Sequence, residues 1–376
     1  MAPGTMPAGL GQRLLYYGNL CVDNVLTVAS YPKEDGSERA KAARKSVGGN
    51  AGNSTRVLVQ LLNKGCCASL VAPVPRFSDP DTTFARMNLE NYGVDTSLLV
   101  EAGGDALPSS FILSSEETGS RTIVSTRNGC PELSISDFIK VLHITFATNA
   151  IKEFGYPSWC HLECRQQPDV MLQMAKAWCM ETAAQSLELP LSLEVEKPSV
   201  NPAALPPLLA MCKFVLFSQP FVEANHDFFF AQTSDHTCIQ ENAEEWEGHM
   251  AMRCLRAIRA TVGVASLDAT WICTWGEHGA FGLQTTTNRG FYEPAHKQAA
   301  VVDSLGAGDT FLATCLHELL GGSDVRRTLH IACAVAGQKV AQVGYDNLGS
   351  ALAKTRLLQK QTMASEGITA ENRQAV

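Results

Sequence analysis

The stretch Val301-Val-Asp-Ser-Leu-Gly-Ala-Gly-Asp-Thr-Phe311 decides how the rest of the chain is interpreted. An apolar pair leads into three small residues, Gly306, Ala307 and Gly308, and a long helical pattern follows Asp309. Glycines allow a sharp turn and let an anion approach backbone N–H groups closely. A helix N-terminus adds free N–H donors and about half a positive charge. The sequence therefore predicts a phosphate-binding turn at the start of a helix.

Asp309 is the unusual residue of this stretch, because it places a carboxylate beside the predicted anion site. Aspartate is a good N-cap of helices, so a purely structural role is one interpretation. The other is a general base, which takes the proton from a hydroxyl group that receives a phosphoryl group. The motif alone leaves both interpretations open.

Length and composition indicate a globular protein with a sizeable core. The chain has 376 residues, of which 45% are apolar and 18% charged, and its net charge is −8. This charge, without a long basic run, argues against nucleic acids and membranes as partners. Residues 1–12 are rich in Pro and Gly and lack a signal-peptide core, so we expect a short flexible leader. The thirteen cysteines are expected to be reduced and mostly buried in a cytoplasmic protein.

Apolar runs and helical patterns alternate along the chain. This alternation predicts an α/β fold with a mainly parallel central sheet covered on both faces. The expected main domain covers residues 13–349, and a polar tail covers 350–376. Strands are expected at 14–21, 67–74, 141–146, 190–195, 214–218 and 270–275, and helices at 83–92, 170–185 and 250–261.

Two further stretches place polar side chains where open α/β sheets bind ligands. Asp23 is predicted to follow the first strand, and Gly48-Gly-Asn-Ala-Gly-Asn53 precedes a helix that is expected to begin near Asn53. Asn50 and Asn53 offer both donors and acceptors, which recognition of sugar hydroxyls requires. A solvated loop aspartate and a simple glycine turn are the structural alternatives, and these residues alone do not decide between them.

A hairpin pattern lies between Ser109 and Ser125, where two strand-like runs flank Glu116-Glu-Thr-Gly119. Arg121 begins the second run. An exposed arginine at a strand start is usually a solvated charge, but near a phosphate or a sugar it orients the ligand. The chain contains neither a P-loop motif nor a Gly-x-Gly-x-x-Gly after the first strand, which argues against P-loop enzymes and dinucleotide oxidoreductases.

Taken together, these stretches resemble the ribokinase-like (pfkB) family of carbohydrate kinases, and within it the ketohexokinases, which are fructokinases. The resemblance runs from about Leu14 to Leu348 and implies a three-layer α/β/α fold with a small β lid from about 31–47 and 109–125. The stretches that carry it are Tyr31-Pro-Lys-Glu-Asp35, Gly48-Gly-Asn-Ala-Gly-Asn53, Arg121-Thr-Ile-Val124, Glu194-Val-Glu-Lys-Pro198, Val301–Phe311 and Ala334-Val-Ala-Gly337.

The resemblance implies ATP-dependent phosphorylation of a ketohexose, with D-fructose giving fructose 1-phosphate. Asp309 would be the general base, the backbone amides of Gly306, Ala307 and Gly308 would form the anion hole, and Arg121 would lie near the sugar or the transferred phosphate. The implied sugar ligands are Asp23, Gly49, Asn50, Asn53 and Asp309, with Asp35 reaching the partner's sugar. The implied nucleotide pocket contains Gly276, Gly279, Gly306, Gly308 and Cys333.

The resemblance also implies Mg²⁺ with ATP, a monovalent cation such as K⁺ near Asp303 and Ser304, and a homodimer formed through the lids. The chain departs from the ketohexokinase pattern at several places. The Glu-Gly-Arg run expected after the mid-chain strand is matched with residues 145–148, Gln219 replaces a lysine, and residues 151–185 and 224–267 form longer segments. A kinase of another sugar or a nucleoside, and a weakened sugar- or nucleotide-binding homologue, are therefore the alternatives.

Overall fold

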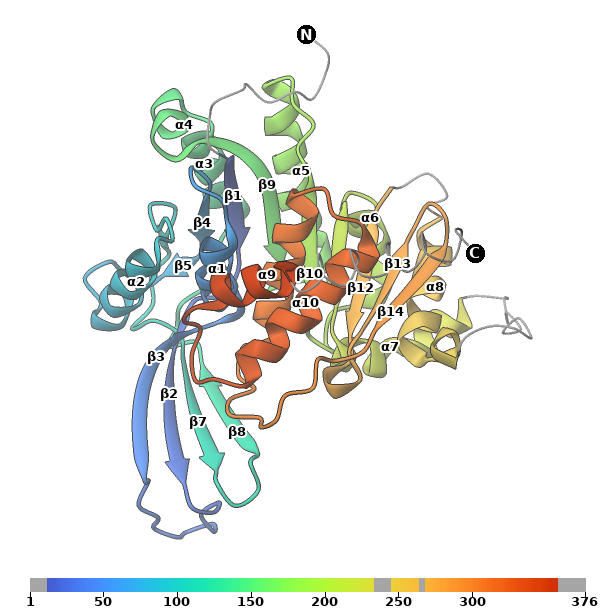
Figure 1. Ribbon diagram of the computed structural model, residues 1–376. Helices are drawn as coiled ribbons and strands as arrows, with labels where there is room; N and C mark the ends of the chain where they lie inside the picture. Colours follow the sequence, from blue (N-terminus) through green and yellow to red (C-terminus); the bar gives the residue numbers. More distant parts are fainter. Residues whose placement is uncertain (1–11, 233–244, 264–267, 358–376) are drawn as a thin grey trace.

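The computed structural model describes residues 12–232, 245–263 and 268–357. Within these residues the centre of the molecule is an eight-stranded sheet in the order β14-β13-β12-β11-β10-β9-β1-β4 (Figure 1). Neighbouring strands from β4 to β12 are parallel, and β13 and β14 add an antiparallel edge. The strands are β1 Gln12–Tyr17, β4 Cys67–Val71, β9 Tyr156–Glu163, β10 Leu191–Val195, β11 Phe214–Phe217, β12 Thr270–Thr274, β13 Ala280–Gln284 and β14 Arg289–Glu293.

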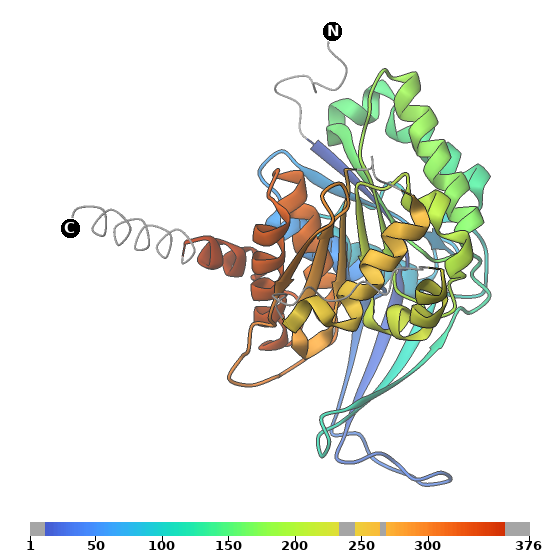
Figure 2. The same cartoon turned by 90° about the vertical axis from the view of Figure 1, so that its right-hand side faces the viewer.

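Helices cover both faces of this sheet, which confirms the predicted three-layer arrangement (Figure 2). Successive side chains of a strand point to opposite faces, so Leu15 and Tyr17 of β1 enter one core while Leu14 and Tyr16 enter the other. The first core contains helices α3 Ile135–Thr145, α5 Pro168–Ala184, α6 Pro206–Leu209, α7 Gln219–Ala231 and α8 Met250–Val262. The second contains α1 Asn50–Leu61, α2 Pro80–Tyr92, α9 Ala307–Leu320 and α10 Val325–Val340.

The predicted lid is confirmed as a separate four-stranded sheet that projects away from the main body (Figure 1). Its order is β3-β2-β7-β8, and its outermost strand β8 is exposed at every residue. The strands are β2 Cys21–Val28, β3 Ala42–Gly48, β7 Ser109–Ser115 and β8 Arg121–Thr126, and a small pair, β5 Pro73–Val74 and β6 Val100–Glu101, lies beside the main body.

The strand predicted at 141–146 is wrong, because these residues belong to α3. Phe138, Val141, Leu142 and Thr145 are buried at helical spacing, and Ser134 caps the helix by accepting a hydrogen bond from the N–H of Asp137. The mid-chain strand is β9, after the short helix α4 Thr148–Phe154. The segment 151–185, which is longer than the ketohexokinase pattern implies, therefore supplies a core strand and a core helix, β9 and α5.

Two boundaries near the site also differ from the prediction. The first strand ends at Tyr17, and Asp23 lies inside the lid strand β2, because the residues around Gly18 break the apolar run into two strands. Helix α1 begins at Asn50, three residues earlier than expected, with Gly49 as its N-cap at φ 85°. The strands at 190–195, 214–218 and 270–275 and the helices at 83–92, 170–185 and 250–261 are confirmed to within a few residues.

The remaining expectations concern the ends and one segment. Residues 348–357 form a helix, whereas the predicted leader up to residue 11, residues 233–244 and 264–267 of the longer segment 224–267, and the tail beyond 357 lie outside the described residues. Among the described helices none combines the length and the apolar character needed to cross a lipid bilayer.

Candidate active site

Polar side chains gather where β1, β9 and β10 end, beside the N-terminus of α9 and the root of the lid. The carboxyl ends of parallel strands meet at one edge of the sheet, and this edge is the usual ligand site of open α/β folds. Here Glu163 ends β9, Glu196 follows β10, and Asn19 follows β1. Helices α1 and α9 pack against each other across the same edge.

Asp309 lies in the first turn of α9 and is only 9% exposed. Its carboxylate oxygen Oδ2 accepts a hydrogen bond of 2.7 Å from Nδ2 of Asn53 in α1. The N-cap of α9 is Gly306, and no side chain caps this helix end. The interpretation of Asp309 as an N-cap is therefore wrong, and its carboxylate faces another helix instead of its own N–H groups.

Burial is the main cause that raises the pKa of Asp309 to about 8, and the neighbouring carboxylates Glu196 and Glu163 act in the same direction. The Asn53 hydrogen bond and the positive charge of Arg56 act in the opposite direction. A general base works best when its pKa lies near the working pH. The environment of Asp309 thus gives a carboxylate the basicity that proton abstraction from a hydroxyl group requires.

The glycine turn before Asp309 has the conformation that a phosphate site needs. Gly306 has φ 76°, which favours glycine, and a Cβ built there would lie 1.9 Å from the hydroxyl oxygen of Tyr345. A Cβ built at Gly308 would meet open space, so the chain beside Asp309 is approachable. Gly306, Ala307 and Gly308 form the start of a 14-residue helix, where backbone N–H groups and the helix dipole favour an anion.

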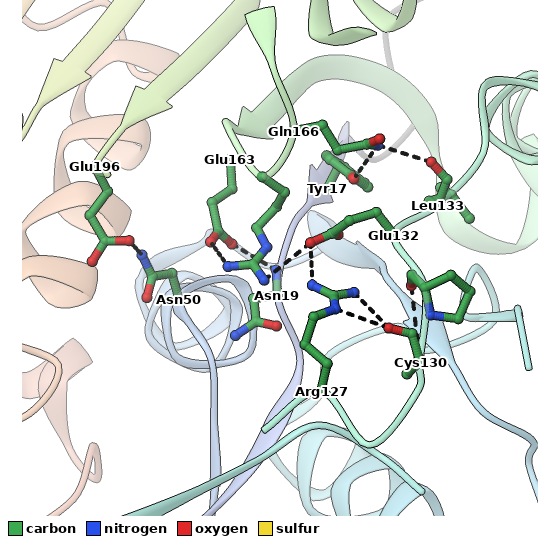
Figure 3. A network of polar contacts seen from close by, with 12 residues as sticks. Tyr17, Asn19, Asn50, Arg127, Cys130, Glu132, Leu133, Glu163, Gln166 and Glu196 are labelled. Atoms are coloured by element: carbon green, nitrogen blue, oxygen red, sulfur yellow. Dashed lines mark hydrogen bonds and ion pairs between the residues drawn. The ribbon is translucent and has the colours of Figure 1, made fainter. Parts of the chain in front are cut away.

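Glu163 is a site residue that sequence reasoning missed (Figure 3). It is 2% exposed, and its Oε2 accepts a hydrogen bond of 2.7 Å from the backbone N–H of Asn19. Arg165 pairs with Glu163 at 3.2 Å and with Glu132 at 3.3 Å, and Arg127, just after the lid strand β8, also pairs with Glu132. A chain of charges thus joins the lid root to the site.

The position of Glu163 and Arg165 corrects the sequence match. Glu163 ends β9, the true mid-chain strand, and Arg165 lies two residues later, so the Glu-Cys-Arg run at 163–165 occupies the place of the expected Glu-Gly-Arg. Thr145, by contrast, is buried in α3 and donates its hydroxyl to the carbonyl of Val141. The apparent departure from the Glu-Gly-Arg pattern at 145–148 results from the wrong strand prediction at 141–146. The charged run His161-Leu-Glu-Cys-Arg165 is the sequence signal that indicates the correct position of this pattern.

The predicted sugar-side residues meet at the junction of lid and body. Asp23 is buried in β2, and a Cβ at Gly48 would lie 2.1 Å from its Oδ2, so the two strands can pair only because residue 48 is glycine. Burial raises the pKa of Asp23 as well. Asn50 donates through Nδ2 to Glu196 at 2.9 Å (Figure 3), and Gly49 lies against the carbonyl of Asn19. Asp35 lies away from this junction, in the loop between β2 and β3.

Asp303 ties the lid to the glycine turn. Its carboxylate lies 3.3 Å from the side-chain nitrogens of Arg44 and Lys339 and 3.9 Å from Arg121, and Lys339 also donates to its backbone carbonyl at 2.9 Å. Three cations already surround this carboxylate, so it does not fit the predicted role of a K⁺ ligand. The exposed Ser304 contacts the turn through its carbonyl, which accepts from Ala307 N–H at 3.3 Å.

The predicted nucleotide residues Gly279 and Cys333 lie beside the end of β14, and Gly276 lies in the loop between β12 and β13. A Cβ at Gly279 would lie 2.1 Å from the carbonyl oxygen of Glu293, and the Cys333 sulfur lies 3.9 Å from the same oxygen. Gly276, at φ 55°, faces the side chain of Gln219, which donates to Glu223 at 2.7 Å. Glycine at position 279 therefore permits the close approach of the chain just after β14 to this loop.

Comparison with known proteins agrees with this geometry. Residues 241–350 match the sequence model of the pfkB family carbohydrate kinases. Mouse ketohexokinase is 28% identical over 339 residues, which cover 90% of this chain and 99% of that protein.

This chain has the ribokinase fold. Arabidopsis thaliana ribokinase, solved with ribose and ATP, aligns with a TM-score of 0.65 at 17% identity and covers 94% of this chain and 99% of its own. The nucleoside kinase of Burkholderia thailandensis, solved with inosine, aligns with a TM-score of 0.61 at 16% identity and covers 92% and 96%. At this identity the structures show the shared fold.

The raised pKa of Asp309 predicts the pH dependence of turnover. The carboxylate accepts a proton only when it is ionised, and burial moves its pKa from the ordinary range to about 8. We therefore expect kcat to rise with pH through a midpoint near 8 and to level off above it. A flat profile of kcat between pH 6 and 9, measured in buffers of constant ionic strength, would contradict this prediction.

Replacing Asp309 by Asn separates catalysis from stability. Asn keeps the shape and accepts from Asn53, but it takes no proton, so we expect kcat to fall by about 10²–10⁴.

The wild-type fold keeps a proton on Asp309 that the unfolded chain releases, so its stability falls as pH rises from about 4 to 8. We expect the Asn variant to be more stable by about 2 kcal/mol or more at pH 8, since one pKa unit corresponds to about 1.4 kcal/mol. Steady-state kinetics and urea unfolding test both outcomes, and a variant with near-normal kcat and reduced stability contradicts the assignment.

Proposed function

We propose that this protein transfers the γ-phosphoryl group of ATP to a hydroxyl group of a ketohexose, and that D-fructose, phosphorylated at its C1 hydroxyl, is the substrate. The observation that carries the proposal is the buried Asp309 carboxylate at the glycine turn of α9, held by Asn53. The similarity to mouse ketohexokinase over nearly the whole of both chains supports the choice of sugar.

In this proposal the sugar binds between the lid and the sheet edge. Asp23 and Glu163 accept hydrogen bonds from sugar hydroxyls, and Gly49 and Asn50 at the start of α1 contact the same ligand. Asn53 already uses both ends of its amide on Asp309 and Arg56, so its contribution to the sugar is limited to its second N–H. Glu163 is held in place by Asn19 and Arg165, which suits a residue that orients a ligand.

The transfer step needs alignment more than covalent help. Asp309 takes the proton from the attacking hydroxyl, the oxygen attacks the γ-phosphorus, and the bond to the β-phosphate oxygen breaks to release ADP. Backbone N–H groups at Gly306–Gly308 and the guanidinium of Arg121 stabilise the charge on the transferred group. Bound Mg²⁺ supplies further charge neutralisation, and it usually arrives on the nucleotide phosphates instead of in a protein cage. In the described ranges no three or more His, Cys, Asp or Glu side chains form such a cage.

A substrate panel tests the proposal. ADP release is measured with ATP and D-fructose, other ketohexoses, aldoses, ribose and nucleosides, and the product is identified by the position of its phosphate. We expect D-fructose to give the highest kcat/KM and the Asp309→Asn variant to lose that activity. A preference for ribose or a nucleoside would assign the fold to another acceptor, and no turnover with any acceptor would support a binding protein instead.

The lid offers a surface for a second copy of the chain. Leu26, Phe111 and Val124 share one face of the lid sheet, opposite to the face that carries Asp23, Arg44 and Arg121. Phe111 is 53% and Val124 is 64% exposed. The exposed edge strand β8 and this apolar face are the kind of surface that a partner covers. We infer a homodimer through the lids, in which Asp35 approaches the partner's sugar.

Charge on this face should therefore separate the dimer. We expect the wild-type protein to sediment as a dimer at micromolar concentration, and the Phe111→Asp/Val124→Lys variant to sediment as a monomer with a raised KM for sugar. Met180→Asp is the matched control, because Met180 is 73% exposed on α5, away from the lid. A wild-type monomer with full activity, or a double variant that stays dimeric, would rule out the lid interface.

A further inference from the structure

Arg56 is a buried cation directly behind the proposed catalytic base. It lies in α1, three residues after Asn53, and is only 4% exposed. Its NH2 group donates hydrogen bonds to Oδ1 of Asn53 and, at 2.7 Å, to the carbonyl of Val47 at the end of β3. No carboxylate forms a direct ion pair with Arg56 among the described residues, although an isolated buried charge is costly.

Aromatic rings take the place of a paired carboxylate. The guanidinium carbon of Arg56 lies 4.5 Å from the ring centre of Tyr345 and 5.8 Å from that of Tyr92. Such contacts stabilise a desolvated cation. The Tyr345 ring also lies 5.3 Å from the Lys339 ammonium, and its hydroxyl packs against Gly306. Tyr345 therefore joins Arg56 to the glycine turn of the anion hole.

Arg56 determines which way the Asn53 amide points. A guanidinium has donors and no acceptor, so the amide must turn its carbonyl oxygen toward Arg56. The NH2 end then faces Asp309, at 2.7 Å from Oδ2. An amide N–H stabilises an ionised carboxylate, whereas an amide oxygen in the same place would accept a hydrogen bond only from a protonated one. The orientation of Asn53 thus favours the ionised form of Asp309 that accepts a proton.

We propose that Arg56 is a positioning residue of the catalytic base: it locks the Asn53 amide toward Asp309 and, through Tyr345, couples that base to the Gly306 turn. The proposal rests on the proposed kinase function, because Asp309 is the base of that reaction. It assigns to α1 a role beyond contact with the sugar.

The charges around Asp309 decide the sign of the expected effect. Glu163 from β9 and Glu196 after β10 raise its pKa, while Asn53 and Arg56 from α1 lower it. Tyr345, whose own pKa is raised by burial, also lies near Asp309 and stays neutral. Loss of the Arg56 charge and release of the Asn53 amide therefore both move the pKa of Asp309 upward.

The test uses Arg56→Met, which keeps much of the side-chain volume and removes the charge and the donors. We expect kcat with ATP and D-fructose at pH 7 to fall roughly threefold to tenfold, with recovery toward high pH as the midpoint of the acid limb moves up by roughly half a unit to one unit. Arg56→Lys, which keeps the charge, should restore part of the loss. Arg86→Met is the matched control, because Arg86 also lies against an aromatic ring, Phe77, but on the exposed surface of α2.

Two outcomes separate the inference from a purely structural role. If Arg56→Met melts at a lower temperature but keeps the wild-type kcat and pH midpoint, Arg56 only packs the core and the inference is wrong. If Asn53→Leu and Asn53→Leu/Arg56→Met show the same kcat, Arg56 acts through Asn53 as proposed, whereas additive losses contradict that route.

A readout without substrate keeps the inference distinct from the proposed function. The carboxyl carbon-13 signal of Asp309, assigned by its absence in Asp309→Asn, gives the titration midpoint directly. If no sugar is phosphorylated, the proposed function fails, and an upward midpoint shift in Arg56→Met still supports the Arg56 contact. An unchanged midpoint in that variant overturns the inference, whatever the activity.

Discussion

The fold buries the carboxylate of Asp309 at the N-terminus of α9, and the surrounding contacts lower the free-energy cost of burying its charge. A buried carboxylate without partners would remain protonated at neutral pH. Here the N–H group of Asn53 and the positive end of α9 oppose the effects of burial and of Glu163 and Glu196. The sum of these effects places the pKa of Asp309 near the working pH. The burial that lowers the stability of the fold therefore also makes the Asp309 carboxylate basic enough to accept a proton.

Side-chain contacts from several elements hold the residues around the Asp309 carboxylate in place. Helix α1 brings Asn53 and Arg56 to Asp309, and Asp303 connects the glycine turn to Arg44 and Arg121 of the lid. On the opposite side, the Glu163–Arg165–Glu132–Arg127 chain reaches from the sheet edge to the root of the lid. The lid is therefore bound to the body by charge pairs at both of its ends, and its position bears directly on the sugar side of the site.

The sequence predicts those turns and strands whose conformation depends on residues close to one another in the chain. The glycine turn, the lid hairpin of β7 and β8 and most of the parallel strands followed from turn residues and apolar periodicity, whereas the lid strand β2 was not predicted. Short apolar runs are ambiguous, so 141–146 was assigned to a strand although its buried residues recur at helical spacing. The strand β9 does not follow from the sequence, because its polar residues and Pro157 interrupt the apolar pattern. Glu163 and Arg165 are therefore not expected at the end of a core strand. Arg56 could not be found from sequence, because its partners Val47, Tyr92 and Tyr345 come from separate parts of the chain.

The most direct test of the account is a crystal structure of the protein with D-fructose and a non-hydrolysable ATP analogue. The account predicts the C1 hydroxyl within hydrogen-bond distance, about 2.6–3.2 Å, of an Asp309 carboxylate oxygen. It also predicts the γ-phosphate over the backbone amides of Gly306–Gly308, with the Asn53 amide between Asp309 and Arg56. A complex in which both ligands are bound and no sugar hydroxyl approaches Asp309, or in which the phosphates lie away from the glycine turn, would contradict it.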